Sequence, residues 1–373
     1  MYKNKIVIEL VGFDYINHGS ILMLESVIKG LNTKNCIFCN SPSIDRPIEK
    51  NSKYNILYLF NFSGFYTLLS FIVPILFKKL LNKFSIISVY DVDYIIDISG
   101  FTYSSVWGNK PFINLLSILI RSYATRVKLI LLPQAFGPFS KFHSLIFKIL
   151  CKRSNIVYVR DKISFNHIIK ATGKSNYNNI KLYPDFTCIL KKKGISSKDG
   201  NVIYINPNYR LVDKFGIGLN ELVEFYNKII VSHSNYKFKI IYFEKNDQLY
   251  FKNCFNDLDR YGFEEMNNDL IFDNCRIMIG SRFHAIVSCL NLTIPVIGIS
   301  WSHKYHELFR EYDISEFCHN TLNNDLVINQ IYSLNDNNKL SEIKQKLKCI
   351  NDYNLTKVNS LFDDLNDSIS FTN

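Results

Sequence analysis

Short apolar runs alternate with segments of helical periodicity along most of the chain. Residues 5–11 are β-branched and apolar, residues 12–19 have the glycines and polar side chains of a loop, and residues 21–31 carry apolar side chains near helical spacing. The first half repeats this order, with apolar runs at 94–98, 127–132 and 156–159 and helix-length segments at 111–123 and 141–152. This alternation predicts a parallel sheet with helices on both faces.

A polar segment, residues 191–201 (KKKGISSKDGN), interrupts this order and predicts a linker. The order then returns, with apolar runs at 202–206, 238–243, 276–279 and 295–299 and a helical segment at 219–231. The chain has 373 residues, which suits two domains. We predict α/β domains at 1–190 and 202–335, then a helical tail at 336–373 with an amphipathic helix near 341–361. The cleft between the domains is the expected active site, because ligands of open α/β sheets bind beyond the carboxyl ends of the strands.

One segment, residues 65–83, is unusually apolar. It begins with FYTLLSFIVPILF and continues through Lys78, Lys79 and Lys83. The apolar part is interrupted by Pro74 and is shorter than the roughly 20 residues that a membrane-spanning helix needs. The favoured interpretation is a buried helix that is kinked or ends near the proline. The alternative is an apolar face with a basic rim that makes peripheral contact with a membrane.

The composition is that of a globular protein with a basic balance. There are 44 lysines and arginines against 33 acidic residues, a formal charge of +11. Such a charge attracts anions, including nucleic acids, anionic membranes and phosphorylated small molecules. The chain has no clustered basic helix and no aromatic–basic repeat, so we do not expect a nucleic-acid partner.

Cysteine usage and the first residues of the sequence indicate the cellular compartment of the protein. The nine cysteines form no regular framework, and Cys36 and Cys39 are a lone CxxC pair, most simply interpreted as buried residues. Residues 1–10 resemble a strand that leads into a loop, not a signal peptide. We therefore expect reduced thiols and a cytoplasmic protein, with peripheral contact at the inner face of the membrane as the alternative.

The segment with the most chemical content is residues 278–306. A predicted strand ends at Gly280, and Ser281, Arg282 and His284 follow where a helix begins. Arginine can bind an anion with two hydrogen bonds, histidine titrates near neutral pH, and the first turn of a helix has unpaired backbone N–H groups. This combination predicts a site for a phosphate or a carboxylate. His303 and His306 are three residues apart, but without a placed carboxylate we interpret them as surface histidines and predict no metal.

The run GSRFHAIVSCLNLTIPVIGISWSHK resembles the C-terminal signature of the polysaccharide pyruvyl transferase family. Three further segments match in the right order: VGFDYINHGSILML, LLPQAFGPF, and VYVRDKISFNHI followed by YPDF. The resemblance extends from about residue 6 to residue 310. The sequence departs from the family where Asn-x-Gly-Asp is replaced by NHGS at 17–20, and where a glycine cluster is reduced to SGF at 99–101.

The resemblance implies transfer of a pyruvyl group from phosphoenolpyruvate to a sugar of a cell-surface polysaccharide or its precursor, commonly as a cyclic ketal. It implies two Rossmann-like domains similar to a GT-B glycosyltransferase, with the acceptor on the N-terminal side, the donor anion on the C-terminal side, and no cofactor. Arg282 and His284 match the Arg-x-His motif of the family, Arg160 matches its Arg-Asp/Glu segment, and Lys304 occupies the place of a family lysine.

These matches suggest catalytic and binding roles. The expected catalytic residues are Arg160, Arg282 and His284, with His284 either a general acid or a phosphate ligand. For the base that accepts the hydroxyl proton, Asp14, Asp97 and Asp185 remain open, since each lies near a predicted strand end. The expected substrate-binding residues are Asn17, Gly19, Gln134, Asp185, Ser281 and Lys304.

A GT-B glycosyltransferase that uses a nucleotide sugar is the main alternative. It would share the two-domain architecture and would need a carboxylate for the ribose, a role open to Glu244 or Glu307. The combination of Arg282, His284 and Arg160 favours the pyruvyl transferase interpretation.

Overall fold

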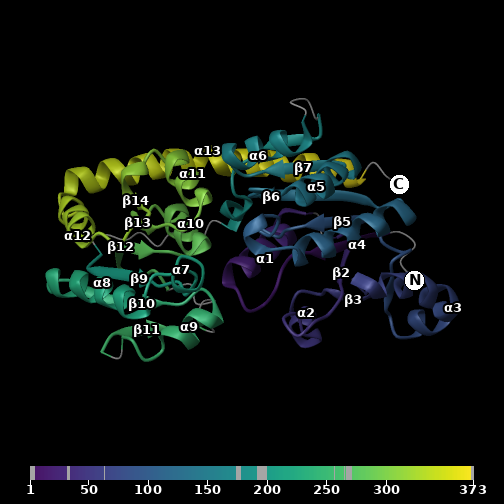
Figure 1. The fold of residues 1–373 in the computed structure, drawn as a ribbon, viewed down its shortest axis with the longest axis horizontal. Coiled ribbons are helices and arrows are strands. Elements are labelled where there is room, and N and C mark those ends of the chain that lie inside the picture. Colours follow the sequence, from purple (N-terminus) through teal and green to yellow (C-terminus); the bar gives the residue numbers. More distant parts are fainter. Residues whose placement is uncertain are drawn as a thin grey trace. The chain divides into compact units, whose positions relative to one another are not determined.

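The computed structural model describes residues 5–31, 34–62, 64–173, 178–190, 200–255, 257–263, 265 and 271–370. The chain divides into two compact units (Figure 1). The described residues of unit 1 lie within Met1–Tyr15, Met23–Phe186 and Lys357–Asn373, and those of unit 2 lie within Ile16–Leu22 and Thr187–Thr356. The predicted linker falls mostly on residues 191–199, which lie outside the described residues.

Unit 1 is built on a parallel sheet with the strand order β4-β3-β2-β1-β5-β6-β7-β8. The strands are β1 (Ile6–Val11), β2 (Cys36–Asn40), β3 (Leu57–Phe60), β4 (Ile87–Ser88), β5 (Tyr94–Asp97), β6 (Lys128–Gln134), β7 (Ile156–Val159) and β8 (Ile180–Leu182). The strand order reverses between β1 and β5, which pair with Val11 opposite Asp97. A crevice for ligands is expected at this switch point.

The helices of unit 1 connect successive strands. They are α1 (His18–Gly30), whose first residues belong to unit 2, α2 (Ile48–Lys53), α3 (Leu69–Lys83), α4 (Lys110–Ala124), α5 (Lys141–Arg153) and α6 (Lys162–Thr172), with short 3₁₀ helices η1 (Gly64–Leu68), η2 (Ser105–Trp107) and η3 (Phe186–Leu190). Apolar side chains of α4 and α5 pack on those of β5 and β6 to form one large core. Cys36 and Cys39 are buried in β2 as free thiols, as expected.

Unit 2 repeats this architecture with the strand order β11-β10-β9-β12-β13-β14, all parallel. The strands are β9 (Val202–Asn206), β10 (Lys237–Ile241), β11 (Asp259–Tyr261), β12 (Cys275–Gly280), β13 (Val296–Ile299) and β14 (Cys318–His319). The helices are α7 (Arg210–Asp213), α8 (Leu219–Ser232), α9 (Lys245–Phe251), α10 (Phe283–Asn291), α11 (His303–Glu311) and α12 (Asn324–Ser333). Here the order reverses between β9 and β12, so Asn206 and Gly280 end side by side.

The predicted parallel α/β architecture is confirmed, including a helical tail. The tail helix α13 (Asn337–Ser370) is longer than the predicted 341–361, and its residues divide between the two units after Thr356. Residues 16–22, which end a loop and begin α1, were predicted within the N-terminal domain. Their contacts group them with unit 2, and the backbone of Ile16 and His18 hydrogen-bonds to the segment after β10.

Segment 65–83 is helical and kinked, as the sequence indicates, but its predicted burial is wrong. Phe77, three residues after Pro74, has non-helical backbone angles (φ −119°, ψ 27°). Ile75 and Leu76 are 68% and 69% exposed. The buried side chains of α3 are Ser70, Pro74 and Leu81. The helix contacts the edge strand β4, which is two residues long and covers one narrow stripe of it.

Among the described residues, no helix is both long and apolar enough to cross a membrane.

A buried ion pair links the central strand of unit 1 to α4. Arg121 donates two hydrogen bonds, of 2.7 and 2.9 Å, to the two carboxylate oxygens of Glu9, and both side chains are almost fully buried. Glu9 is the charged residue within the apolar run IVIELV. Its position in a buried strand requires a cation, and α4 supplies it.

We expect Arg121→Met to lower the free energy of unfolding by about 3–5 kcal/mol, because Glu9 would be left as a buried, unpaired charge. Urea denaturation followed by circular dichroism measures this. The double variant Glu9→Gln/Arg121→Met should recover part of the loss. Lys228→Met, which removes a solvent-exposed partner of Glu224, should leave the midpoint nearly unchanged. Equal midpoints for Arg121→Met and the wild type would contradict the importance of the pair.

Candidate functional site

The loop before α1 belongs to unit 2 through backbone hydrogen bonds. The His18 N–H donates to the Phe243 carbonyl at 2.8 Å, and the Lys245 N–H donates to the Ile16 carbonyl at 3.1 Å. The Asn17 side-chain oxygen accepts from the Gly19 N–H at 2.9 Å and so occupies a backbone donor at the helix start. The predicted binding residue Asn17 therefore has a structural task, which is to begin α1 at this point.

His284 lies directly against Gly19. A Cβ atom added to Gly19 would lie 2.2 Å from Nδ1 of His284 and 2.6 Å from its Cγ. Real side chains do not approach this closely, so glycine is the residue that allows the imidazole to pack on α1. The predicted residues Gly19 and His284, separated by more than 260 positions in the sequence, are thus brought into contact within unit 2.

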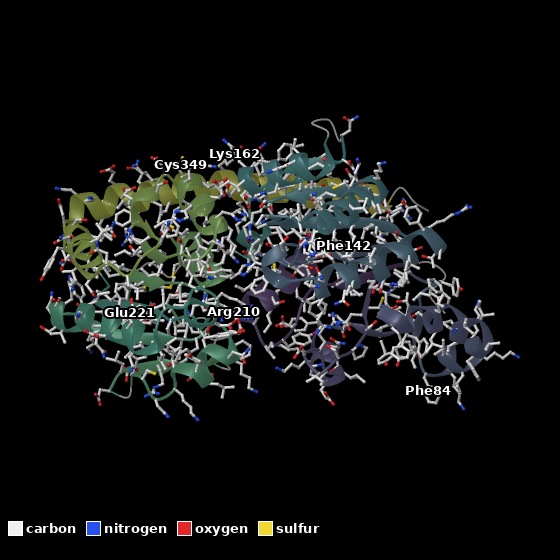
Figure 2. The ribbon with its side chains drawn as sticks, viewed as in Figure 1. Phe84, Phe142, Lys162, Arg210, Glu221 and Cys349 are labelled. Carbon is white, nitrogen blue, oxygen red and sulfur yellow. The ribbon has the colours of Figure 1, made fainter. Side chains whose placement is uncertain are left out.

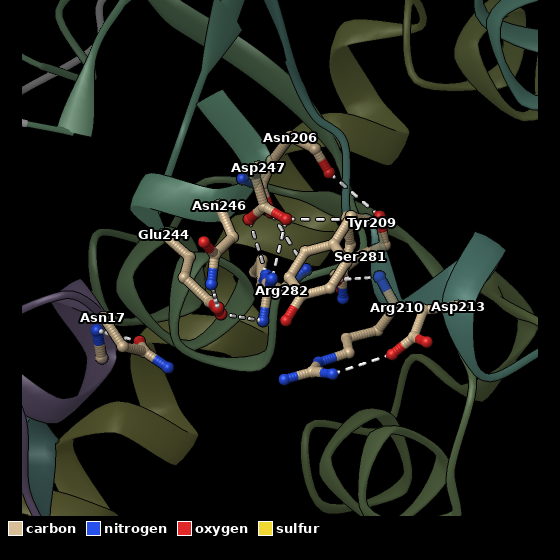
Figure 3. A network of polar contacts seen from close by, with 12 residues as sticks. Asn17, Asn206, Tyr209, Arg210, Asp213, Glu244, Asn246, Asp247, Ser281 and Arg282 are labelled. Carbon is tan, nitrogen blue, oxygen red and sulfur yellow. Dashed lines mark hydrogen bonds and ion pairs between the residues drawn. The ribbon is translucent and has the colours of Figure 1, made fainter. Parts of the chain in front are cut away.

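Arg282 is held between two carboxylates (Figure 3). Its Nε and Nη2 donate to the two oxygens of Asp247 at 2.7 Å each, and its Nη1 lies 2.5 Å from a Glu244 oxygen. Burial alone would lower the pKa of this guanidinium, but the charges of Asp247 and Glu244 raise it overall. Burial raises the pKa of Asp247, and the charge and hydrogen bonds of Arg282 act against that rise. Three of the five N–H donors of Arg282 are committed, so the geometry is that of a positioning cation.

The ends of β9 and β12 fix the backbone around Arg282. Asn206 accepts from the Arg282 N–H at 3.0 Å, and the Ser281 hydroxyl donates to the Asn206 carbonyl at 3.0 Å. The Ser281 carbonyl accepts from Asn208 at 2.6 Å and from the Tyr305 hydroxyl at 2.8 Å. Ser281 is fully buried and takes part in these internal hydrogen bonds, and its predicted contact with substrate stays a prediction. Sequence analysis missed Asn206, Asn208, Asp247 and Tyr305, although Asn206 ends β9 and Asn208 follows it.

The N-terminus of α10 and the Lys304 ammonium place positive charge near the start of α10, the helix that carries His284. The N-cap of α10 is Arg282, whose side chain has no acceptor atom and cannot cap the first N–H groups. The Lys304 ammonium lies 5.0 to 5.4 Å from the ring centroids of Trp301, Phe283 and Tyr305. A helix N-terminus, an imidazole and an ammonium held by aromatic rings form a setting that suits a small anion.

The remaining predicted residues gather in unit 1. Arg160 forms a buried ion pair with Asp185 at 2.9 Å, and its N–H donates to the Gln134 carbonyl at 3.0 Å. Gln134 in turn donates to Asp97 at 3.4 Å. Asp161 accepts from the Ser164 N–H at 2.7 Å as the N-cap of α6. Arg160, Gln134 and Asp185 therefore lie near the carboxyl ends of β6, β7 and β8.

A polar cavity of about 450 Å³ opens at the switch point of the unit 1 sheet. Its wall includes Glu9, Ser41, Arg46, Asn61, Asp97, Ser99, Tyr103, Asn114 and Arg121. Ser41 Oγ, Asn61 Oδ1 and Arg121 Nε are buried and make no hydrogen bond to the part of the chain that the structure describes. Buried polar atoms are normally satisfied, so these three atoms indicate a place for a ligand or water.

Of the three candidate bases, Asp97 lines this cavity. Its Oδ1 accepts from the Ser99 N–H at 2.9 Å, from the Ser99 hydroxyl and from Gln134, and its Oδ2 accepts from the Tyr103 hydroxyl. The carboxylate thus accepts four hydrogen bonds, three at Oδ1 and one at Oδ2. Burial raises the pKa of Asp97, against the effect of the Ser99 and Tyr103 hydrogen bonds. Asp185 is instead ion-paired with Arg160.

The predicted site residues thus fall into two groups, one in each unit. The described residues contain no group of three histidine, cysteine, aspartate or glutamate side chains that could hold a metal ion. His306 hydrogen-bonds to the Ser300 hydroxyl at 2.9 Å.

Comparison with known proteins identifies the family. The family described as polysaccharide pyruvyl transferase matches residues 17–303, most of the chain, so the chain belongs to this family and is a transferase by membership. A comparison with curated protein sequences finds no match.

Solved structures with a similar fold cover nearly the whole chain. HepE from Anabaena, in complex with UDP-glucose, is 12% identical with a TM-score of 0.63 over 97% of this chain and 99% of that chain. A putative UDP-N-acetylglucosamine 2-epimerase from Listeria monocytogenes is 9% identical with a TM-score of 0.60 over 99% and 98%. MurG from Acinetobacter baumannii is 11% identical with a TM-score of 0.50 over 96% and 98%. The fold is therefore GT-B-like, with two Rossmann-like sheets, as predicted.

We expect Gly19→Ala to destabilise the protein by about 1–3 kcal/mol, because the added methyl group overlaps His284. This loss of stability is expected although alanine has a higher helix propensity than glycine. In the His284→Ala background the same substitution should cost much less, since the imidazole is gone. Urea unfolding of the four proteins of this double-mutant cycle measures the coupling. A coupling energy near zero would show that the two residues do not touch.

Proposed function

We propose that the protein transfers a pyruvyl group from phosphoenolpyruvate to two hydroxyls of a sugar, as a cyclic ketal. Two C–O bonds form between C2 of the donor and the sugar oxygens, while the C2–O bond to phosphate and the π bond between C2 and C3 break. One hydroxyl proton ends on C3, which becomes a methyl group, and the other leaves with phosphate. The reaction consumes no water and needs no oxidant.

The observation that carries this proposal is the start of α10 in unit 2, where the ring of Phe283 lies 5.2 Å from the Lys304 ammonium and the neighbouring His284 packs on Gly19. Phosphoenolpyruvate combines a phosphate and a carboxylate on a small frame, which suits a compact electropositive site. His284 is assigned the proton donor to C3, because imidazole titrates near neutral pH and Gly19 holds it in one orientation. Arg282 is assigned a positioning role, because Asp247 and Glu244 occupy most of its donors.

The cavity of unit 1 is assigned to the sugar. Its charged groups are mixed, with Glu9 and Asp97 against Arg46 and Arg121, and amides and hydroxyls lie between them. A neutral ligand with many hydroxyls matches such a wall better than a strong anion does. Asp97 is assigned the base that accepts the hydroxyl proton, since it lies in the wall of this cavity and its Oδ2 accepts one hydrogen bond against three at Oδ1. We assign the reaction to the cytoplasm, where the nine free cysteines would stay reduced.

A nucleotide-sugar donor is the second candidate, favoured by the similarity to HepE, whose structure contains UDP-glucose. The carboxylates considered for the ribose are, however, engaged in ion pairs. Glu244 lies 2.5 Å from Arg282, and Glu307 lies 2.6 Å from Arg310. This commitment supports the phosphoenolpyruvate donor.

Calorimetric titration tests the donor. We expect phosphoenolpyruvate to bind more tightly than inorganic phosphate and the UDP-sugars, with Lys304→Met weakening its affinity about ten- to hundredfold, the value of one charge-assisted hydrogen bond. His284→Gln should preserve binding but lower phosphate release in the presence of acceptor by about 10²–10⁴-fold. Lys252→Met, an exposed lysine on the same unit, is the control.

Two results would change the assignment. Tight binding of one UDP-sugar without binding of phosphoenolpyruvate would move the protein to the glycosyltransferase class. Equal losses of affinity and turnover in His284→Gln would make His284 a ligand of the donor and not the acid.

Turnover should also depend on Asp97. A base acts when deprotonated, and the raised pKa of Asp97 places its acidic limb at a higher pH than the ordinary aspartate value of about 3.9. We expect Asp97→Asn to lower turnover about 10²–10⁴-fold and to abolish this limb, while donor binding is unaffected. A variant with the wild-type pH profile of phosphate release would exclude Asp97 as the base.

A further inference from the structure

The outer face of α3 in unit 1 carries large apolar side chains in contact with solvent. We call the following residues the α3 surface, each between 41% and 69% exposed: Tyr66, Leu68, Leu69, Ile72, Ile75, Leu76, Phe77, Leu80 and Phe84. In Figure 2, Phe84 lies at the periphery of the chain beside this helix. Single exposed apolar residues are common on proteins, but a contiguous set of this size marks an interaction surface.

The exposed residues form a continuous stripe. Ile72 and Leu76 are four residues apart and lie on one side of the helix before the kink at Phe77, and Leu80 is exposed in the part that follows the kink. The buried residues Ser70 and Pro74 lie on the opposite side, towards the rest of unit 1. A helix that is apolar on both sides is normally covered on both sides. The described residues of unit 1 cover one side of α3.

Positive charge lies at the C-terminal end of the apolar stripe. Lys78, Lys79 and Lys83 are exposed after the kink of α3, and Lys79 and Lys83 lie on the same side of this part as Leu80. Residues 50–90 contain five lysines and no aspartate or glutamate, although the whole chain has 33 acidic residues. Lysine stems can lie along an apolar surface while their ammonium groups reach polar or anionic groups beyond it.

We propose that the α3 surface docks on an anionic lipid bilayer, with the helix lying in the interface. An apolar stripe buries itself among acyl chains while flanking lysines meet anionic headgroups, which matches the arrangement seen here. The helix has 15 residues and an internal proline, which suits a helix that lies on a bilayer rather than spans it. A second copy of this chain is a poorer occupant, because it would bring two lysine clusters together. This proposal is independent of the reaction, since it concerns binding to lipid alone.

Sedimentation of the full-length protein with vesicles tests the proposal. We expect binding to phosphatidylcholine vesicles that contain phosphatidylglycerol, weaker binding to pure phosphatidylcholine, and a decrease with added salt. Changing Lys78, Lys79 and Lys83 to glutamine should weaken binding to anionic vesicles about a hundredfold, since each lysine near the surface contributes about fivefold. Leu76→Ser/Leu80→Ser should weaken binding to both kinds of vesicle by at least about tenfold.

Matched controls lie on unit 2. Val231→Ser and Leu249→Ser change apolar residues that are 76% and 57% exposed, and Lys237, Lys339 and Lys348 are exposed lysines for a control triple glutamine variant. All controls should bind as the wild type does. Because every substituted side chain is exposed, thermal unfolding should stay close to that of the wild type, and this is measured in parallel.

Three results would overturn the proposal. The wild type could remain in the supernatant with anionic vesicles. The α3 variants could bind as tightly as the wild type. Light scattering could show a dimer that the leucine variant separates into monomers, without vesicle binding, which would assign the α3 surface to a second copy.

Discussion

The arrangement of unit 2 depends on the pairing of Arg282 with Asp247 and Glu244. Glu244 lies directly before α9, and Asp247 lies in its first turn. The guanidinium therefore links the end of β12 to the segment that follows β10. That segment binds the backbone of residues 16–18, which brings the start of α1 against His284. The guanidinium attracts both carboxylates at 2.5 to 2.7 Å and so offsets part of the cost of burying them. The orientation of the imidazole therefore follows from an ion pair several residues away.

Both units use buried arginines in this way. Arg121 pairs with Glu9 and Arg160 with Asp185 in unit 1, as Arg282 pairs with Asp247 in unit 2. Each pair fixes groups near the carboxyl ends of parallel strands, where ligands of such sheets bind. The result differs between the units. Unit 1 has a cavity with mixed charge and many hydrogen-bonding groups, and unit 2 has a guanidinium enclosed by two carboxylates at the end of β12.

The departures from the family pattern can be interpreted from the contacts. In the segment NHGS, Asn17 and Gly19 remain, and they carry the two tasks that the structure requires: a side-chain hydrogen bond at the helix start and the close approach of His284. Ser20 is buried and its N–H donates to the Asn17 carbonyl. The reduced glycine cluster places Ser99 beside Asp97, where its N–H and hydroxyl both donate to the carboxylate.

The sequence alone determined the parallel α/β architecture, the restart of the strand–helix order after residue 201, and the family. These follow from local periodicity and short motifs, which a linear pattern contains. Only the tertiary structure decided which charges neutralise each other. Arg282 looked like a ligand for an anion until Asp247 and Glu244, about 35 residues earlier, were seen to occupy it. Likewise, the apolar run of α3 predicted burial, but burial needs a neighbouring element, and the short edge strand β4 covers one stripe. Pairing and covering depend on residues distant in sequence, so no local pattern could decide them.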